Sequence, residues 1–250
     1  MKNHFIIPYS GNKREEVEIL YDRIKDKIDN VKYIIEPFCG SCAMSYYISL
    51  MKPNKYEYIL NDNNEYLINL LNIMKDENKY NEFINKINDT IELITNKENY
   101  IKYANKDTFE GWFIGNKIYN IRPFLYPQGK KITKVKTDYP IINFLRTEKV
   151  KILNTDANDI YDEYKLNKKA LMLLDPPYLF TNNSIYKQPT INIYEKLSNE
   201  KKKDIKCKIC LMLNDNYVMK LIFKNYNIYE YDKKYQTTKK DIKHLLIDNF

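Results

Sequence analysis

The residues best suited to chemistry are Asp175-Pro176-Pro177-Tyr178, an acid followed by two prolines and an aromatic ring. The prolines stiffen the loop because their φ angles are fixed and they lack N–H groups. The Asp175 carboxylate and the Pro176 carbonyl are two acceptors for the N–H groups of a planar conjugated amine, whose lone pair they would localise for attack. Tyr178 would stack on a base that has been flipped out of a duplex. We therefore predict that these four residues are catalytic.

The element that has to position Asp175 is the apolar run before it. Residues 170–174 are five apolar residues in a row, Ala-Leu-Met-Leu-Leu. The prolines leave no room for an amphipathic helix, so the run predicts a strand buried on both faces, in the middle of a parallel sheet. Ligands of open α/β sheets bind at the carboxyl edge of the strands. The alternative is a strand that ends in an ordinary Pro-Pro turn.

A second strand ends in a loop suited to a nucleotide-like ligand. Residues 31–35 are predicted to be this strand, and residues 43–50 the helix after it, with Glu36, Phe38 and Gly40 between them. A tight turn from strand to helix with a glycine allows the backbone to approach a ligand closely. The alternative is a strand-turn-helix unit in which Gly40 has a purely structural role.

Two further acids follow predicted strands. Asp62 comes after the strand at residues 56–60, about 20 residues beyond the glycine turn, where an acid can accept hydrogen bonds from both ribose hydroxyls. Asp156 follows the strand at residues 150–153. Each acid could instead cap the helix after it, as could Asn64. Near the N-terminus, Gly11 and Lys13 lie in a loop that opens a predicted helix, Arg14 to Ile28, whose free N–H groups and positive charge suit a carboxylate.

Together these fragments resemble, in the right order, the Dam-like (alpha-group) adenine-specific DNA methyltransferases. The resemblance implies an α/β, Rossmann-like methyltransferase fold with a mixed seven-stranded sheet, helices on both faces and an inserted DNA-recognition lobe of helical and irregular structure. It also implies transfer of a methyl group from S-adenosylmethionine to the exocyclic amine of adenine in double-stranded DNA, without a metal. The cofactor-binding residues that it implies are Tyr9, Lys13, Glu36, Phe38, Gly40, Asp62, Asp156 and Asp175.

The sequence departs from the family pattern at two positions. Asn12 replaces the second glycine of the N-terminal motif, and Cys42 replaces the second glycine of the Glu-Pro-Phe motif. Cys42 introduces a Cβ and a sulfur where the family keeps space. It leaves open the alternative that the protein is a catalytically weak or inactive relative that acts in DNA binding or assembly. A second alternative keeps the reaction but changes the acceptor to cytosine or an amide.

An inserted lobe is predicted at residues 76–149, between a catalytic domain formed by residues 1–75 and 150–250. From Gly111 to Lys151 there are nine basic and two acidic residues, and nine minus two is +7, nearly all of the net charge of +8. Aromatic side chains are interleaved with the charges, a combination that suits DNA binding. The predicted DNA-binding residues are Lys117, Arg122, Tyr126, Lys130, Lys131 and Lys134. The alternative is a solvated basic face over a small aromatic core.

Composition indicates a soluble globular protein of 250 residues with 44% hydrophobic and 30% charged residues. We find no signal peptide or long apolar run, and we expect a cytoplasmic location. Because the abundance of Lys, Asn, Ile and Tyr is typical of an AT-rich genome, the alternative location is wherever that genome is replicated. The cysteines form two Cys-x-x-Cys pairs, Cys39 with Cys42 and Cys207 with Cys210. Because the second pair lies on a predicted strand, its side chains point to opposite faces, which argues against zinc.

Overall fold

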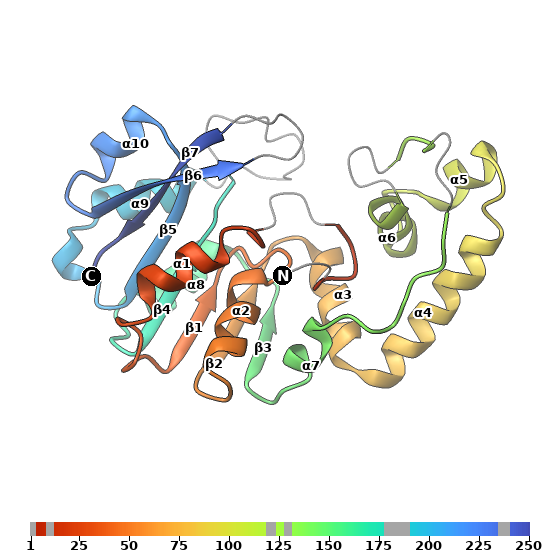
Figure 1. Cartoon of the computed structure of the whole chain (residues 1–250), viewed down its shortest axis with the longest axis horizontal. Coiled ribbons are helices and arrows are strands. Elements are labelled where there is room, and N and C mark those ends of the chain that lie inside the picture. Colours follow the sequence, from red (N-terminus) through yellow and green to blue (C-terminus); the bar gives the residue numbers. More distant parts are fainter. Residues whose placement is uncertain (1–3, 9–12, 119–123, 128–131, 178–190, 235–240) are drawn as a thin grey trace. The chain divides into compact units, whose positions relative to one another are not determined.

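The computed structural model describes most of the chain and divides it into two compact units (Figure 1). The described residues are 4–8, 13–118, 124–127, 132–177, 191–234 and 241–250. The first unit comprises Met1–Glu15 and Asn64–Val150, and the second comprises Glu16–Asn63 and Lys151–Phe250. The predicted division of function between a catalytic domain and a lobe at residues 76–149 stays a prediction.

The second unit is built around a seven-stranded sheet with the strand order β3-β2-β1-β4-β5-β7-β6. The strands are β1 (Tyr33–Glu36), β2 (Glu57–Asn61), β3 (Val150–Leu153), β4 (Ala170–Leu174), β5 (Lys208–Asn214), β6 (Asn227–Lys234) and β7 (Asp241–Asp248). β4 is parallel to both of its neighbours, β1 and β5, and β7 is antiparallel to β5 and β6. This mixed sheet confirms the predicted fold class.

The central strand β4 is buried along its whole length, as the apolar run predicted. Ala170, Met172 and Leu174 belong to one hydrophobic cluster, which also contains residues of the helices α8 (Ala157–Tyr164), α9 (Ile191–Asn199) and α10 (Tyr217–Ile222). Because side chains alternate along a strand, Leu171 and Leu173 point to the opposite face, where they are equally inaccessible to solvent. Apolar packing on both faces therefore fixes the strand that ends at the predicted catalytic loop.

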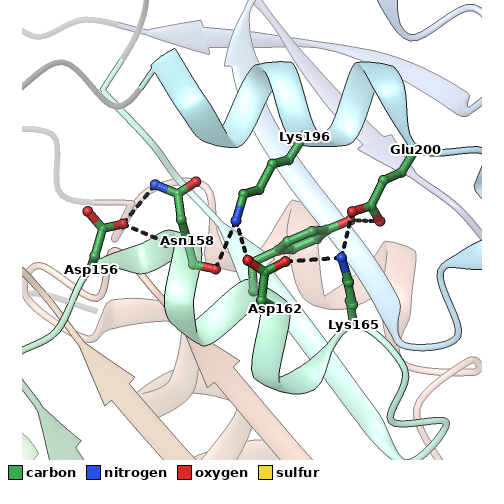
Figure 2. Close-up of polar contacts among 7 residues, drawn as sticks. Asp156, Asn158, Asp162, Lys165, Lys196 and Glu200 are labelled. Atoms are coloured by element: carbon green, nitrogen blue, oxygen red, sulfur yellow. Dashed lines mark hydrogen bonds and ion pairs between the residues drawn. The ribbon is translucent and has the colours of Figure 1, made fainter.

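Helices cover both faces of the sheet in the second unit (Figure 1). α1 (Val17–Ile24) and α2 (Ala43–Met51) lie on one face, and α8 and α9 lie on the other. On the latter face, polar contacts join α8 to α9 and the residue after it (Figure 2). Lys196 pairs with Asp162, while Lys165 pairs with Asp162 at 3.0 Å and with Glu200 at 2.7 Å.

One helix is shorter than predicted: α1 spans Val17–Ile24 instead of Arg14 to Ile28. Directly before it, the buried Glu16 carboxylate accepts hydrogen bonds from Tyr231 Oη and Lys233 Nζ, both at 2.5 Å. On the other face, α9 ends at Asn199 and is followed by a short 3-10 turn, Lys202–Asp204. The contact of Glu200 with Lys165 fixes that residue beyond the end of α9.

The first unit is helical in its described residues. Its helices are α3 (Glu65–Lys75), α4 (Glu77–Glu92), α5 (Lys97–Tyr103), α6 (Phe109–Ile118) and α7 (Ile141–Leu145). The lobe predicted at residues 76–149, of helical and irregular structure, contains α4, α5, α6 and α7. α6 forms despite its two glycines because Phe113 and Ile114 are fully buried, and this burial outweighs weak local helix propensity. No helix among the described residues is long and apolar enough to cross a membrane.

Candidate active site

Three acids lie at the carboxyl ends of adjacent strands. Glu36 is the last residue of β1, Asp62 follows β2, and Asp175 follows β4. The strands β2, β1 and β4 are consecutive neighbours in the sheet, and β1 is parallel to both β2 and β4. Parallel strands end at the same edge, so the sheet brings together the acids that the sequence predicted.

The loop after β1 makes the tight turn that the sequence predicted. Gly40 has a φ angle of 48° and Cys42 has a φ angle of 55°, so both adopt the left-handed conformation. Cys42 thereby follows a backbone path that a glycine would follow without strain, and its side chain is fully buried. The turn is closed by hydrogen bonds from Cys42 N to the Cys39 carbonyl at 2.7 Å and from Gly40 N to Asp62 Oδ2 at 3.1 Å.

Glu36 is buried at the beginning of α2. It is 1% exposed, and its Oε1 accepts a hydrogen bond from Ser45 N at 2.7 Å. Since the N-cap residue Cys42 makes no side-chain cap, the Glu36 carboxylate serves as the cap of this helix. Burial raises the pKa of Glu36 from 4.5 to about 7; the hydrogen bond from Ser45 opposes this shift, and the charge of Asp175 adds to it. The two carboxyl groups are therefore close enough to interact electrostatically.

The Asp62 loop is joined to the two loops beside it. The Asp62 carboxylate accepts the Gly40 N–H, and the Asp62 carbonyl accepts a hydrogen bond from Asn154 Nδ2 at 2.7 Å. Asn64, two residues further on, is the N-cap of α3, and its side chain accepts hydrogen bonds from Tyr66 N and Leu67 N. Asn64 therefore caps α3, which confirms the alternative given for it in the sequence. The Asp62 carboxylate instead bonds to the glycine turn.

Asp156 occupies the N-cap position of α8 (Figure 2). Its Oδ1 accepts hydrogen bonds from Asn158 N at 2.8 Å and from Asn158 Nδ2 at 2.7 Å. The residue is exposed. The geometry therefore shows the capping role that was the alternative for this acid. Its assignment to the adenine ring of the cofactor stays a prediction.

The predicted catalytic loop is held by a hydrogen bond from α9. Asp175 and Pro177 are half-buried and Pro176 is buried. The Pro177 carbonyl accepts a hydrogen bond at 3.2 Å from the hydroxyl of Tyr194, a buried residue of α9. Tyr178 lies outside the described residues. Tyr194 was missed by the sequence analysis, because nothing in a helical residue 17 positions away indicates a contact with this carbonyl.

Comparison with known proteins supports the motif analysis. Residues 9–126 match the model of the D12 class N6 adenine-specific DNA methyltransferase family. The match supports the predicted resemblance over this part of the chain. It includes the N-terminal, glycine-loop and Asp62 motifs, and it ends before Asp175.

Two individual relatives give further context. A candidate methyltransferase of Haemophilus influenzae is 27% identical, in an alignment that covers 74% of this chain and 67% of that protein. The crystal structure of a candidate RNA methyltransferase from Pyrococcus horikoshii has a TM-score of 0.43 and 13% identity, and covers 97% of this chain and 86% of that one. The structural likeness is too distant to indicate a substrate.

The remaining residues predicted to bind the cofactor are Phe38, Lys13 and Tyr9. Phe38 is half-buried and packs against the hydrophobic cluster of the sheet. Lys13 is 5% exposed and belongs to the first unit. Tyr9 lies outside the described residues. Their contact with a cofactor stays a prediction.

The predicted DNA-binding residues that the structure describes already have protein partners. Lys117 donates hydrogen bonds to the Ile6 carbonyl at 2.7 Å and to Tyr139 Oη at 2.6 Å, and burial lowers its pKa from 10.5 to about 8. Lys134 pairs with Glu92 at 2.5 Å. The ring of Tyr126 packs edge-on against Tyr100 at 5.8 Å. Arg122, Lys130 and Lys131 lie outside the described residues.

The four cysteines are buried free thiols. Cys207 packs in the same cluster as Ile209 and Leu211, so Cys210, three residues along the strand, points to the other face. Among the described residues, no group of three or more His, Cys, Asp and Glu side chains is arranged to hold a metal ion.

Proposed function

We propose that the protein is an S-adenosylmethionine-dependent methyltransferase that methylates the exocyclic amino group of adenine in DNA. The observation that carries the proposal is the position of Asp175-Pro176-Pro177. This loop follows β4, the strand beside the one that ends in Glu36, in a chain whose residues 9–126 match an adenine-specific DNA methyltransferase family.

The donor set fits the proposed cofactor. Gly40 provides a left-handed turn without a Cβ, where the backbone can approach a ligand, and Asp62 lies beside it as an acceptor for ribose hydroxyls. Glu36 and Asp175 lie at the ends of adjacent strands, and the like charges of two acids favour a cationic ligand. When bound, S-adenosylmethionine supplies an electrophilic methyl group on its positively charged sulfonium. Phe38 and Asp156 are the remaining residues of the second unit proposed to hold it.

Asp175 and Pro176 prepare the attacking amine. The carboxylate and the carbonyl each accept one N–H of the adenine amino group, which directs its lone pair away from the ring. A bond from nitrogen to the methyl carbon forms as the bond from carbon to the leaving group breaks, and the nitrogen then loses one proton. Asp175 is the nearest acceptor and passes this proton to solvent. Positioning accounts for much of the acceleration.

The base reaches this loop by flipping out of the duplex, and Tyr178 stacks on it to recover part of the unstacking energy. Arg122, Lys130 and Lys131 are proposed to contact DNA phosphates. For Lys117 and Lys134 a phosphate contact competes with the partners that the structure gives them. The fully buried Cys42 keeps a glycine-like backbone, which supports an active enzyme over an inactive relative.

The deciding experiment is a measurement of methylated bases by mass spectrometry. Unmodified DNA is incubated with the protein and S-adenosylmethionine, digested and analysed, with Asp175→Ala and Asp215→Ala in parallel. Asp215 is the matched control because it follows β5 as Asp175 follows β4, and it pairs with Lys220 at 2.8 Å. We expect N6-methyladenine from the wild type and from Asp215→Ala, and at least a hundredfold less from Asp175→Ala.

Other products would change the proposal. Methylcytosine would keep the mechanism and change the substrate. No methylated base in any of several DNA sequences would reject catalysis on DNA and favour the binding or assembly alternative.

A further inference from the structure

A fully buried asparagine joins the three loops at the carboxyl edge of the sheet. Asn61 is the last residue of β2 and is 0% exposed. Its Nδ2 donates hydrogen bonds to the Pro37 carbonyl and to the Thr155 carbonyl, each at 3.0 Å. Its Oδ1 accepts hydrogen bonds from Thr155 N at 2.9 Å and from Thr155 Oγ1 at 3.1 Å. The side chain thus uses two donors and two acceptor positions, the full capacity of a primary amide.

The main chain around Asn61 reinforces the same connection. Its carbonyl accepts a hydrogen bond from Cys39 N at 2.7 Å. The next residue, Asp62, accepts a hydrogen bond from the Gly40 N–H through its carboxylate and from Asn154 through its carbonyl. Hydrogen bonds of Asn61 and Asp62 therefore join three loops that are distant in sequence.

Each of these loops carries a residue proposed to contact the cofactor. Pro37 lies directly before Phe38, Asn61 directly before Asp62, and Thr155 directly before Asp156. A hydrogen-bonding group that is left without a partner costs far more folding free energy when it is buried than when it is exposed, and this holds for the amide and for the groups that it bonds to. A change at Asn61 will therefore shift the spacing of all three loops.

We infer that Asn61 is a positioning residue, whose side-chain amide sets the spacing of the glycine turn, Asp62 and Asp156 and thereby determines affinity for S-adenosylmethionine. The inference rests on the proposed function. Asn61 acts through its neighbours and affects cofactor binding more than the rate of methyl transfer, because Asp175 follows a different strand, β4.

The test compares Asn61→Asp with Asn249→Asp. Asn61→Asp keeps the size of the side chain but replaces both donors by an oxygen facing the Pro37 and Thr155 carbonyls. Asn249 is the matched control: its side chain also joins main-chain groups, Ile209 N at 2.8 Å and the Cys207 carbonyl at 3.0 Å, at the amino end of β5. Both variants lose an amide donor to a carbonyl, but only one of them adjoins the proposed cofactor loops.

We expect Asn61→Asp to raise the Kd for S-adenosylmethionine, measured by calorimetry, at least about tenfold. In the methylation assay it should raise the KM for S-adenosylmethionine in parallel and leave kcat within about threefold. Asn249→Asp should leave Kd, KM and kcat within about twofold of the wild type. Equal Kd values for Asn61→Asp and the wild type would overturn the inference.

A milder pair of variants covers the case in which Asn61→Asp does not fold. Thr155→Val removes only the hydroxyl that bonds to Asn61 Oδ1, and Thr155→Ser retains it. We expect a several-fold higher Kd for the valine variant and a Kd near that of the wild type for the serine variant. Equal Kd values for the two would also reject the inference. A wild type that does not bind S-adenosylmethionine would instead reject the proposed function.

Discussion

Replacing Glu36 by glutamine should remove a pH dependence from the stability of the protein. Glu36 is 1% exposed and burial raises its pKa from 4.5 to about 7. One pKa unit corresponds to about 1.4 kcal/mol, so the shift corresponds to about 3 kcal/mol. Glutamine keeps the shape of the side chain and an oxygen that can accept the Ser45 N–H.

The direction of the effect follows from proton binding. Between pH 4.5 and about pH 7 the folded protein keeps the Glu36 proton, whereas the unfolded chain has lost it. The folded state therefore binds more protons in this window, and stability falls as pH rises. The stabilisation is fully present below pH 4.5 and is lost as pH rises through the folded pKa of about 7.

The assay is urea unfolding of the cofactor-free protein at several pH values across this window, followed by circular dichroism. We expect the free energy of unfolding of the wild type to fall more than that of Glu36→Gln, by up to about 3 kcal/mol. Glu195→Gln is the control, because Glu195 is exposed on α9. This substitution should leave the slope of the unfolding free energy against pH as it is in the wild type. Parallel curves for Glu36→Gln and the wild type would show that Glu36 is not buried as described.

Two further predictions concern buried groups. Cys42 has a φ angle of 55°, so we expect the Cys42→Gly variant to be more stable than the Cys42→Ala variant by about 1 kcal/mol in urea unfolding. This is the reverse of the usual order in helices. A more stable alanine variant would mean that this backbone is not left-handed. At Lys117, burial lowers the pKa from 10.5 to about 8, so the unfolded chain binds more protons between these values and stability rises with pH. Lys117→Met should flatten this rise in unfolding experiments above about pH 8, and an unchanged slope would place the amine in solvent.

The sequence by itself determined several strands of the sheet and the acids that follow them. The apolar run before Asp175 could form only a buried strand, and glycine and proline marked the turns after β1 and β4. These features depend on neighbouring residues, so local pattern was sufficient to predict the strands that precede Glu36, Asp62 and Asp175. The mixed seven-stranded sheet was predicted from the family resemblance. The same local rules overestimated α1 and missed α6, whose forming depends on burial.

Only the tertiary structure decided what surrounds each group. Burial beside Asp175 changes the acidity of Glu36, and Lys117, predicted to bind DNA, donates to the Ile6 carbonyl and the Tyr139 hydroxyl. Asn61 follows the strand predicted at residues 56–60 and its sequence neighbours indicate no role for it, yet its side chain bonds to Pro37 and Thr155, which lie 24 and 94 positions away. Partners at such separations are brought together by the packing of the whole sheet. Their contacts cannot be deduced from the residues on either side of them.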